Sequence, residues 1–230
     1  MSTFAYGPDL LGDVLVTRHV IPTAPESTGN SCPPQFLRTL RWPRTQAGDT
    51  AVISCPLGTT GRATWSCAEE GGHWDTERPD LSGCQSLWLI KILSQLRGRS
   101  GGSVVHLAKE MAHYSVFNAL YGGDVTGLAT AAAVVAEKLS YELEAVPSEQ
   151  QREAVVMEVA QSVVKAASVA LSAANAPAWK DLPAGERERA ATAFVRAVKA
   201  AGMLLPEAAR ENQEITISSP NIRKWMYFYS

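Results

Sequence analysis

The sequence contains no cysteine outside residues 32–84, although the chain has 230 residues and places four cysteines within that interval. It also lacks a run of about twenty apolar residues, which a helix needs to cross a bilayer. No Asn-x-Ser/Thr glycosylation sequon occurs. The net charge of −2 and the pI near 6.1 argue against a nucleic-acid partner, because such proteins usually carry a strongly basic face.

The four cysteines, Cys32, Cys55, Cys67 and Cys84, are separated by 22, 11 and 16 residues. Structural zinc sites usually present cysteines in pairs two to four residues apart, so this spacing does not predict a metal site. No nucleophile motif flanks these residues, which argues against thiol catalysis. An even number of cysteines among glycines and prolines favours disulfide bonds within a small extracellular module.

Three tryptophans, Trp42, Trp65 and Trp74, lie within the cysteine-bearing segment. A domain of about fifty-five residues buries little of its surface and is only marginally stable without cross-links, so its few large side chains are needed inside. We therefore predict that the three indoles form the module core, packed on the disulfides and on Val52 or Ile53. A ligand-binding aromatic platform is the alternative.

Three arginines, Arg38, Arg41 and Arg44, recur at every third position around Trp42. Charges beside apolar rings suit the polar rim of a protein interface, so we regard the three arginines as a candidate interaction surface. A solvated loop face is the plainer interpretation, since exposed charges commonly contribute little.

Several residue types in the cysteine-bearing segment fall in a fixed frame. The frame reads Cys32-Pro-Pro, Trp42-Pro-x-Thr-x-x-Gly48, Cys55-Pro-x-Gly-x-x-Gly61, Gly72-x-Trp74 and Pro79-Asp-Leu-Ser-x-Cys84. It resembles the hormone receptor motif of adhesion G-protein-coupled receptors, and within that group the latrophilins. The resemblance covers about residues 32–88 and implies the bridges Cys32–Cys67 and Cys55–Cys84.

One departure from the wider family concerns a third bridge. Receptors for peptide hormones use it to tie an N-terminal helix onto this module, whereas here Arg41 precedes Trp42 and no further cysteine lies upstream. Since the latrophilin-type module shares the two-bridge pattern, the departure favours that branch and argues against peptide-hormone binding.

The composition changes after Gln85 to Ala, Val, Leu, Glu and Lys. A stripe of Leu89, Ile92, Leu93 and Leu96 predicts a first helix directly after the module. Further helices are expected over 104–114, over 124–144, from Ser148 as N-cap through Ala170, and over 185–205, with a loop at 175–183. Five helices with short connections predict an antiparallel bundle.

Three polar residues, His106, Glu110 and His113, share one face of the second predicted helix. The two histidines are about 10.5 Å apart along the axis, by the helical rise, and one ion cannot bridge that distance. We therefore interpret the three residues as a polar flank and predict no metal or cofactor.

The helical region resembles the first subdomain of the GAIN domain, which follows the hormone receptor motif in latrophilins. The local matches are Tyr121-x-Gly-Asp-Val125 and Trp179-Lys-Asp181. Glu214–Ile217 is similar to the opening strand of the second, β-rich GAIN subdomain. The resemblance implies that the family's self-cleavage sequence and membrane helices lie beyond residue 230.

These patterns together predict an α+β chain with four parts. Residues 1–31 form a Ser/Thr/Pro-containing linker, predicted to be disordered and without the features of a signal peptide. The two-disulfide module covers 32–88, and the helical subdomain covers 89–212. Residues 213–230 are the start of a β-rich subdomain followed by a divergent tail.

No nucleophile, base and orienting group cluster in the sequence, so we expect no enzyme activity. The resemblance implies an extracellular fragment of a receptor that couples cell-surface recognition to G-protein signalling. Its expected partners are cell-surface proteins and the rest of the parent receptor, with no nucleic acid. A soluble secreted binding protein or decoy built from the same modules is the alternative.

Overall fold

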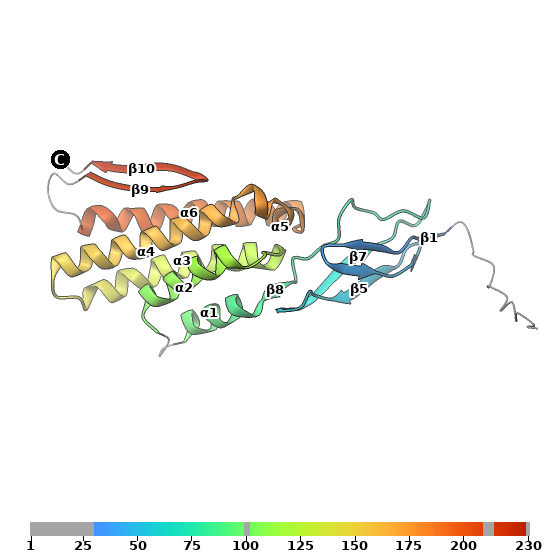
Figure 1. The fold of residues 1–230 in the computed structure, drawn as a ribbon, viewed down its shortest axis with the longest axis horizontal. Helices are drawn as coiled ribbons and strands as arrows, with labels where there is room; N and C mark the ends of the chain where they lie inside the picture. The colour runs from blue at the N-terminus through green and yellow to red at the C-terminus, as the bar shows by residue number, and fades with distance from the viewer. Residues whose placement is uncertain (1–29, 99–101, 209–213, 229–230) are drawn as a thin grey trace, which may run out of the picture.

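The computed structural model describes residues 30–98, 102–208 and 214–228 of the chain. A β-rich module occupies one end of an elongated molecule, and a bundle of helices occupies the other (Figure 1). Helix α1 begins at Leu87, directly after the last strand of the module. The chain is therefore α+β, as the sequence predicts. The predicted linker falls outside the described residues except for positions 30 and 31.

Short antiparallel ladders build the module, pairing β1 with β4, β2 with β3, β5 with β7 and β6 with β8. The strands are β1 Ser31–Cys32, β2 Gln35–Leu37, β3 Leu40–Trp42, β4 Thr45–Gln46, β5 Thr50–Ser54, β6 Thr59–Thr60, β7 Arg62–Ser66 and β8 Gln85–Ser86. In the longest ladder, Ala51 lies opposite Trp65 and Ile53 lies opposite Ala63. Along β5, Ala51 and Ile53 face the core and Val52 between them is exposed. Of the two residues predicted to pack on the tryptophans, it is therefore Ile53 that does so.

Two disulfide bonds close the module. Cys32 is joined to Cys67 and Cys55 is joined to Cys84, with Cα–Cα distances of 5.7 and 5.5 Å. These are the pairs that the family resemblance implies. A bridge that closes a loop of about thirty residues contributes roughly 3–4 kcal/mol by restricting the unfolded chain.

The three tryptophans of the module form a compact aromatic cluster. Trp65 stacks on Trp74 with ring centroids 4.2 Å apart, and Trp42 meets Trp65 edge-on at 5.4 Å. All three are buried, as are Cys32, Cys67 and Cys84, and the partly buried Cys55 packs against them. The indole N–H groups of Trp65 and Trp74 donate to backbone carbonyls, which satisfies the polar atoms of buried rings. The aromatic cluster therefore lies in the module core.

The bundle follows the apolar periodicity of the sequence. The helices are α1 Leu87–Arg97, α2 Val104–Phe117, α3 Gly122–Glu144, α4 Glu149–Ala170, the short α5 Ala176–Lys180 and α6 Ala184–Ala208, with a 3₁₀ turn η1 at Ala173–Asn175. The predicted stripe of α1 is buried in full. Helix α4 lies against α2, α3 and α6, and alanines such as Ala160 and Ala167 occupy the contacts. Small side chains there let the helix axes approach closely.

The predicted loop at 175–183 is wrong in part, because it contains α5. Pro177 lies in the first turn of that helix, where a missing N–H costs nothing and the fixed φ favours the helix. The Trp179 indole donates to the Ala170 carbonyl at 2.7 Å, which holds α5 against the end of α4. Ser148 occupies the N-cap position of α4, but its side chain makes no capping hydrogen bond.

A hairpin of β9 (Glu214–Ser219) and β10 (Ile222–Phe228) lies along the bundle against α4 (Figure 1). The strand expected at Glu214–Ile217 is thus confirmed. Ile217 is buried in the helical core, and Asn221 hydrogen-bonds to both the side chain and the carbonyl of Ser168 on α4. The hairpin therefore covers part of the α4 surface.

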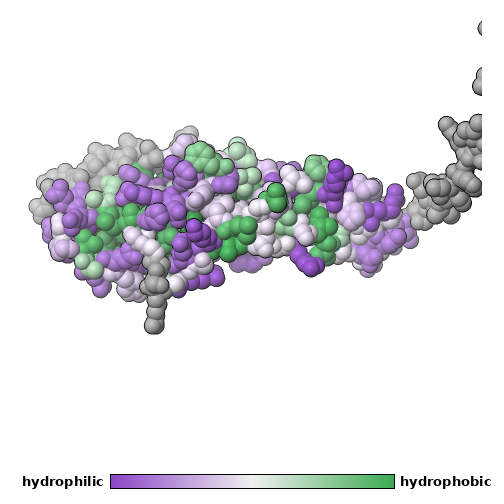
Figure 2. Space-filling view, turned by 60° about the horizontal axis from the view of Figure 1, so that its bottom comes forward, coloured by the Kyte–Doolittle hydropathy of each residue, from purple (hydrophilic) through white to green (hydrophobic). Residues whose placement is uncertain are grey.

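Figure 2 shows one long face of the molecule, on which hydrophobic residues form small patches separated by hydrophilic ones. Within the described ranges, no single helix is both long and apolar enough to cross a membrane. A bent pair, Glu149–Ala170 with Ala173–Lys180, meets that test by length and composition only.

Peptide mapping under non-reducing conditions is expected to recover one cross-linked peptide pair containing Cys32 and Cys67 and another containing Cys55 and Cys84. Replacing Cys55 and Cys84 together by serine should lower the free energy of unfolding by about 2–5 kcal/mol, because the loop is no longer closed in the unfolded chain. Recovery of a Cys32–Cys55 peptide pair would contradict the connectivity.

Candidate functional site at the module–bundle junction

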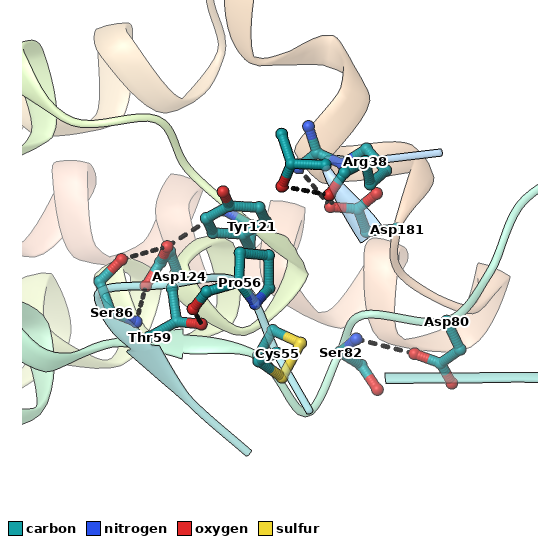
Figure 3. The surroundings of a disulfide bond; sticks show 12 residues. Arg38, Cys55, Pro56, Thr59, Asp80, Ser82, Ser86, Tyr121, Asp124 and Asp181 are labelled. Atoms are coloured by element: carbon teal, nitrogen blue, oxygen red, sulfur yellow. Dashed lines mark hydrogen bonds and ion pairs between the residues drawn. A yellow bond between two sulfur atoms is a disulfide. The ribbon is translucent and has the colours of Figure 1, made fainter. Parts of the chain in front are cut away.

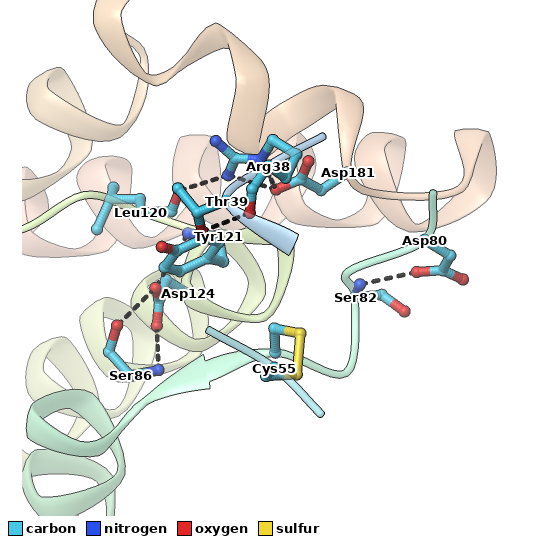
Figure 4. Close-up of polar contacts among 11 residues, drawn as sticks. Arg38, Thr39, Cys55, Asp80, Ser82, Ser86, Leu120, Tyr121, Asp124 and Asp181 are labelled. Atoms are coloured by element: carbon cyan, nitrogen blue, oxygen red, sulfur yellow. Dashed lines mark hydrogen bonds and ion pairs between the residues drawn. A yellow bond between two sulfur atoms is a disulfide. The ribbon is translucent and has the colours of Figure 1, made fainter. Parts of the chain in front are cut away.

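The arginines of the candidate interaction surface do not share one environment. Arg41 and Arg44 are exposed, and Arg44 contacts the Ser31 hydroxyl at 3.2 Å. The Arg38 side chain is only 16% exposed and points toward Asp181 of the bundle (Figure 4). Arg38 therefore does not share the exposed surface of the other two arginines, because the buried Asp181 carboxylate binds it, and the interaction surface itself stays a prediction.

Arg38 reaches from the β2–β3 turn to two segments of the bundle (Figure 4). Its Nε and Nη2 donate to Oδ2 of Asp181 at 3.1 and 2.6 Å, and Nη2 also donates to the Leu120 carbonyl at 2.9 Å. The guanidinium carbon lies 4.9 Å from the centroid of the Tyr121 ring, in cation–π geometry. One side chain thus ties the module to the residues that precede α3 and follow α5.

Asp181 lies immediately after α5, and its side chain is fully buried. Burial raises the pKa of the Asp181 carboxyl above its ordinary value, while the hydrogen bonds and charge of Arg38 act in the opposite direction. The pair is charge-assisted and mostly shielded from water, so removal of the cation would strand a buried carboxylate.

A second buried carboxylate, Asp124, joins the same two parts of the chain without a cation in contact (Figure 3). Its Oδ1 accepts from the Ser86 N–H at 2.7 Å, and its Oδ2 accepts from the Ser86 hydroxyl at 2.8 Å. Oδ2 also accepts from the Tyr121 N–H at 3.0 Å, which caps α3. Burial raises the pKa of Asp124, and the hydrogen bonds from Ser86 and Tyr121 partly offset that effect.

Backbone groups meet directly across the junction. The Leu81 N–H donates to the Asp181 carbonyl at 3.0 Å, and the Gly123 N–H donates to the Leu81 carbonyl at 3.3 Å. A Cβ atom on Gly123 would lie 2.4 Å from the Cys84 carbonyl oxygen, so only glycine permits this approach. The Tyr121-x-Gly-Asp-Val125 match is therefore the segment of the bundle on which the module rests.

A groove of about 610 Å³ runs between the module loop 75–80 and the segment 180–184. Trp65 and Leu182 line it, and side chains of both charge signs, such as Asp80 and Lys180, surround it. The groove offers polar and apolar contacts to a partner.

The histidine-bearing face of α2 does not assemble a metal site. His106 Nε2 lies 3.6 Å from Glu110, while the His113 ring packs against Phe117 at 4.8 Å. Among the residues that the structure describes, no three His, Cys, Asp or Glu side chains form a group that could hold a metal ion.

Two protein-family models cover most of the chain. The hormone receptor domain matches residues 29–87, and a model described as AGRL2-4 GAIN subdomain A matches residues 88–205. The boundary between these matches falls at Leu87, where the module ends and α1 begins.

Similar full-length proteins come from insects and mammals. Latrophilin Cirl of Drosophila ananassae is 26% identical over an aligned length of 242. The alignment covers 83% of this chain and 14% of that protein. Adhesion G protein-coupled receptor L1 of Homo sapiens is 28% identical over 203 residues, with the same two coverages. The chain thus spans about 14% of the length of these curated relatives and resembles their extracellular region.

Replacing Arg38 by methionine should lower the free energy of unfolding by about 3 kcal/mol, because the buried Asp181 carboxylate loses its counter-ion. Urea unfolding followed by tryptophan fluorescence measures this change. Arg41→Met, at an exposed position, is the matched control and should change stability by less than about 0.5 kcal/mol. The double variant Arg38→Met with Asp181→Leu should recover most of the loss, and equal losses in the Arg38 and Arg41 variants would contradict the ion pair's role.

Acidification should stabilise the wild-type chain relative to an Asp124→Asn variant. The pKa of Asp124 is raised above 3.8 in the folded chain. Between pH 3.8 and that raised pKa, the native state therefore binds more protons than the unfolded state does. This contribution is complete below 3.8 and is lost as pH rises through the folded pKa. The urea midpoint of the wild type relative to the variant should therefore rise as pH is lowered from 7 towards 3.8. A relative midpoint that falls on acidification would reverse the expected sign.

Proposed function

Since the chain belongs to the latrophilin-like adhesion G-protein-coupled receptors through its hormone receptor domain and GAIN subdomain A, we propose that it supports cell-surface recognition and signalling by a full-length receptor. In this role it is a non-catalytic segment at the extracellular face of the plasma membrane. The observation that carries the proposal is the junction, where the two family modules meet through buried carboxylates and direct backbone contacts.

A junction with these contacts couples the position of the hormone receptor module to the position of the helical bundle. Asp124 fixes the exit of the module at Ser86 to the start of α3, and Arg38 fixes the β2–β3 turn to Asp181. With two such ties, a partner bound to the module also constrains the helices that follow. Such coupling between the module and the bundle suits a segment that lies between a recognition surface and a signalling domain.

The proposed recognition surface lies on the module, on the β2–β3 ladder and the residues that follow it. Arg41 and Arg44 are exposed there, and the cross-strand neighbour of Arg41 is Phe36, which is 69% exposed. Cationic groups beside an exposed aromatic ring suit a protein partner with an acidic and apolar patch. The two-bridge pattern favours such a protein partner over a peptide hormone.

A soluble secreted binding protein built from the same modules is the second candidate. Sequencing of the transcript distinguishes the two: membrane helices downstream support the receptor, and a stop codon after Ser230 supports the secreted protein.

The direct test is a chimera in which residues 30–208 replace the matching segment of human adhesion G protein-coupled receptor L1. We expect the chimera to reach the cell surface and to activate G protein. The variant Arg41→Glu with Arg44→Glu should reach the surface equally but attach less well to partner-bearing cells. Glu69→Arg, at an exposed position elsewhere on the module, is the matched control for a charge change.

Two results would count against the proposal. A chimera displayed at the parental level that fails to activate G protein would remove the signalling role. Unchanged attachment of the double arginine variant would remove the Arg41–Arg44 surface and leave the receptor role in place.

A further inference from the structure

The β2–β3 hairpin turns through Arg38 and Thr39, and both have positive φ, 56° and 63°. Two-residue hairpin loops of this geometry favour Asn and Gly, because a Cβ atom crowds the backbone in the left-handed region. Thr39 is also β-branched, which makes this conformation an outlier for its type. A strained turn persists only where surrounding contacts over-determine it.

Contacts on two sides hold this turn. On the module side, the Leu37 carbonyl, which directly precedes the turn, accepts from the Trp42 indole N–H at 3.4 Å, and this bond ties the hairpin to the aromatic core of the module. At the tip, Arg38 binds Asp181 and the Leu120 carbonyl, both of which belong to the bundle. The strained turn therefore spans the junction and is fixed on each side of it.

We propose that the β2–β3 tip is a strained latch between a closed and an open junction. In the closed state Arg38 locks the module onto the bundle, and the bound guanidinium maintains the strain at Thr39. In the open state Arg38 leaves Asp181, the turn relaxes, and the module pivots on the covalent connection from Cys84 to Leu87.

Opening changes the surface on both sides of the ion pair. Asp181 borders the 610 Å³ groove, and Arg38 borders a second cavity of about 330 Å³ that is also lined by Phe117 and Pro177. Release of the pair would place a carboxylate and a guanidinium, each now unpaired, beside these two hollows. The latch thus sets the orientation of the module and the access to both cavities, independently of any receptor role.

Two backbone amide protons, those of Leu81 and Gly123, are sensitive to opening of the junction, whereas others are sensitive only to unfolding of the module or the bundle. The Leu81 and Gly123 N–H groups donate across the junction and lose their acceptors when it opens. The Cys67 N–H donates to Asp49 within the module, and the Leu171 N–H donates to Ala167 within the bundle. Hydrogen exchange measured by NMR on the full chain can therefore compare junction opening with global unfolding.

The test compares Thr39→Gly with Thr39→Ala, which differ only in the Cβ atom that causes the strain. Thr39→Gly should stabilise the closed state, so Leu81 and Gly123 should exchange roughly fivefold to tenfold more slowly than in Thr39→Ala. Arg38→Lys keeps the charge but loses the planar fork, so exchange at both junction amides should be about tenfold faster. Cys67 and Leu171 should change little in each variant.

Two results would overturn the latch. Equal junction exchange in Thr39→Gly and Thr39→Ala would mean that strain in the turn does not bias the junction. Exchange of Leu81 and Gly123 in step with Cys67 and Leu171 across all variants would mean that the junction opens only when the whole chain unfolds.

Discussion

The disulfide between Cys55 and Cys84 fixes the point at which the module ends and the bundle begins. Cys84 is fully buried, and the two residues after it form β8, which pairs with β6 before α1 starts. The carbonyl of Cys84 also lies against Gly123 at the start of α3. Cys84 is thus cross-linked to the module and in close backbone contact with the bundle. The other contacts across the junction lie around that fixed point.

Two buried carboxylates, Asp124 and Asp181, hold the module in its orientation on the bundle, and they differ in the type of partner that each binds. Asp124 is satisfied by neutral donors close to it in space, so its effect is confined to β8 and the first turn of α3. Asp181 needs the guanidinium of a residue 143 positions earlier. Buried ion pairs add little net stability compared with apolar contacts of equal volume, but they penalise every arrangement that separates the charges. The Arg38–Asp181 pair therefore acts mainly on the specificity of module placement.

The sequence predicted the parts of this structure that local patterns determine. The Trp42, Trp65 and Trp74 core follows from the size of a stapled module, and the α1 stripe follows from a period of 3.6 residues. The pairing of Arg38 with Asp181 could not be predicted, because no local pattern links residues so far apart. The Tyr121–Val125 and Trp179-Lys-Asp181 matches were identified only as marks of the family resemblance, at the start of α3 and before α6. What they could not provide was the role of Asp124 and Asp181, which depends on burial in the assembled junction.

The stacked indoles in the module have a consequence for spectroscopy. Trp65 and Trp74 lie almost parallel, at 14°, with centroids 4.2 Å apart. Two indoles in such close contact are coupled electronically, to an extent set by the angle between their transition moments, and they separate when the module unfolds. The near-ultraviolet absorption and circular dichroism of the chain therefore contain a contribution from this pair. The peptide groups of the helices do not absorb at those wavelengths, so the packing of the module can be followed there apart from the helical content of the bundle.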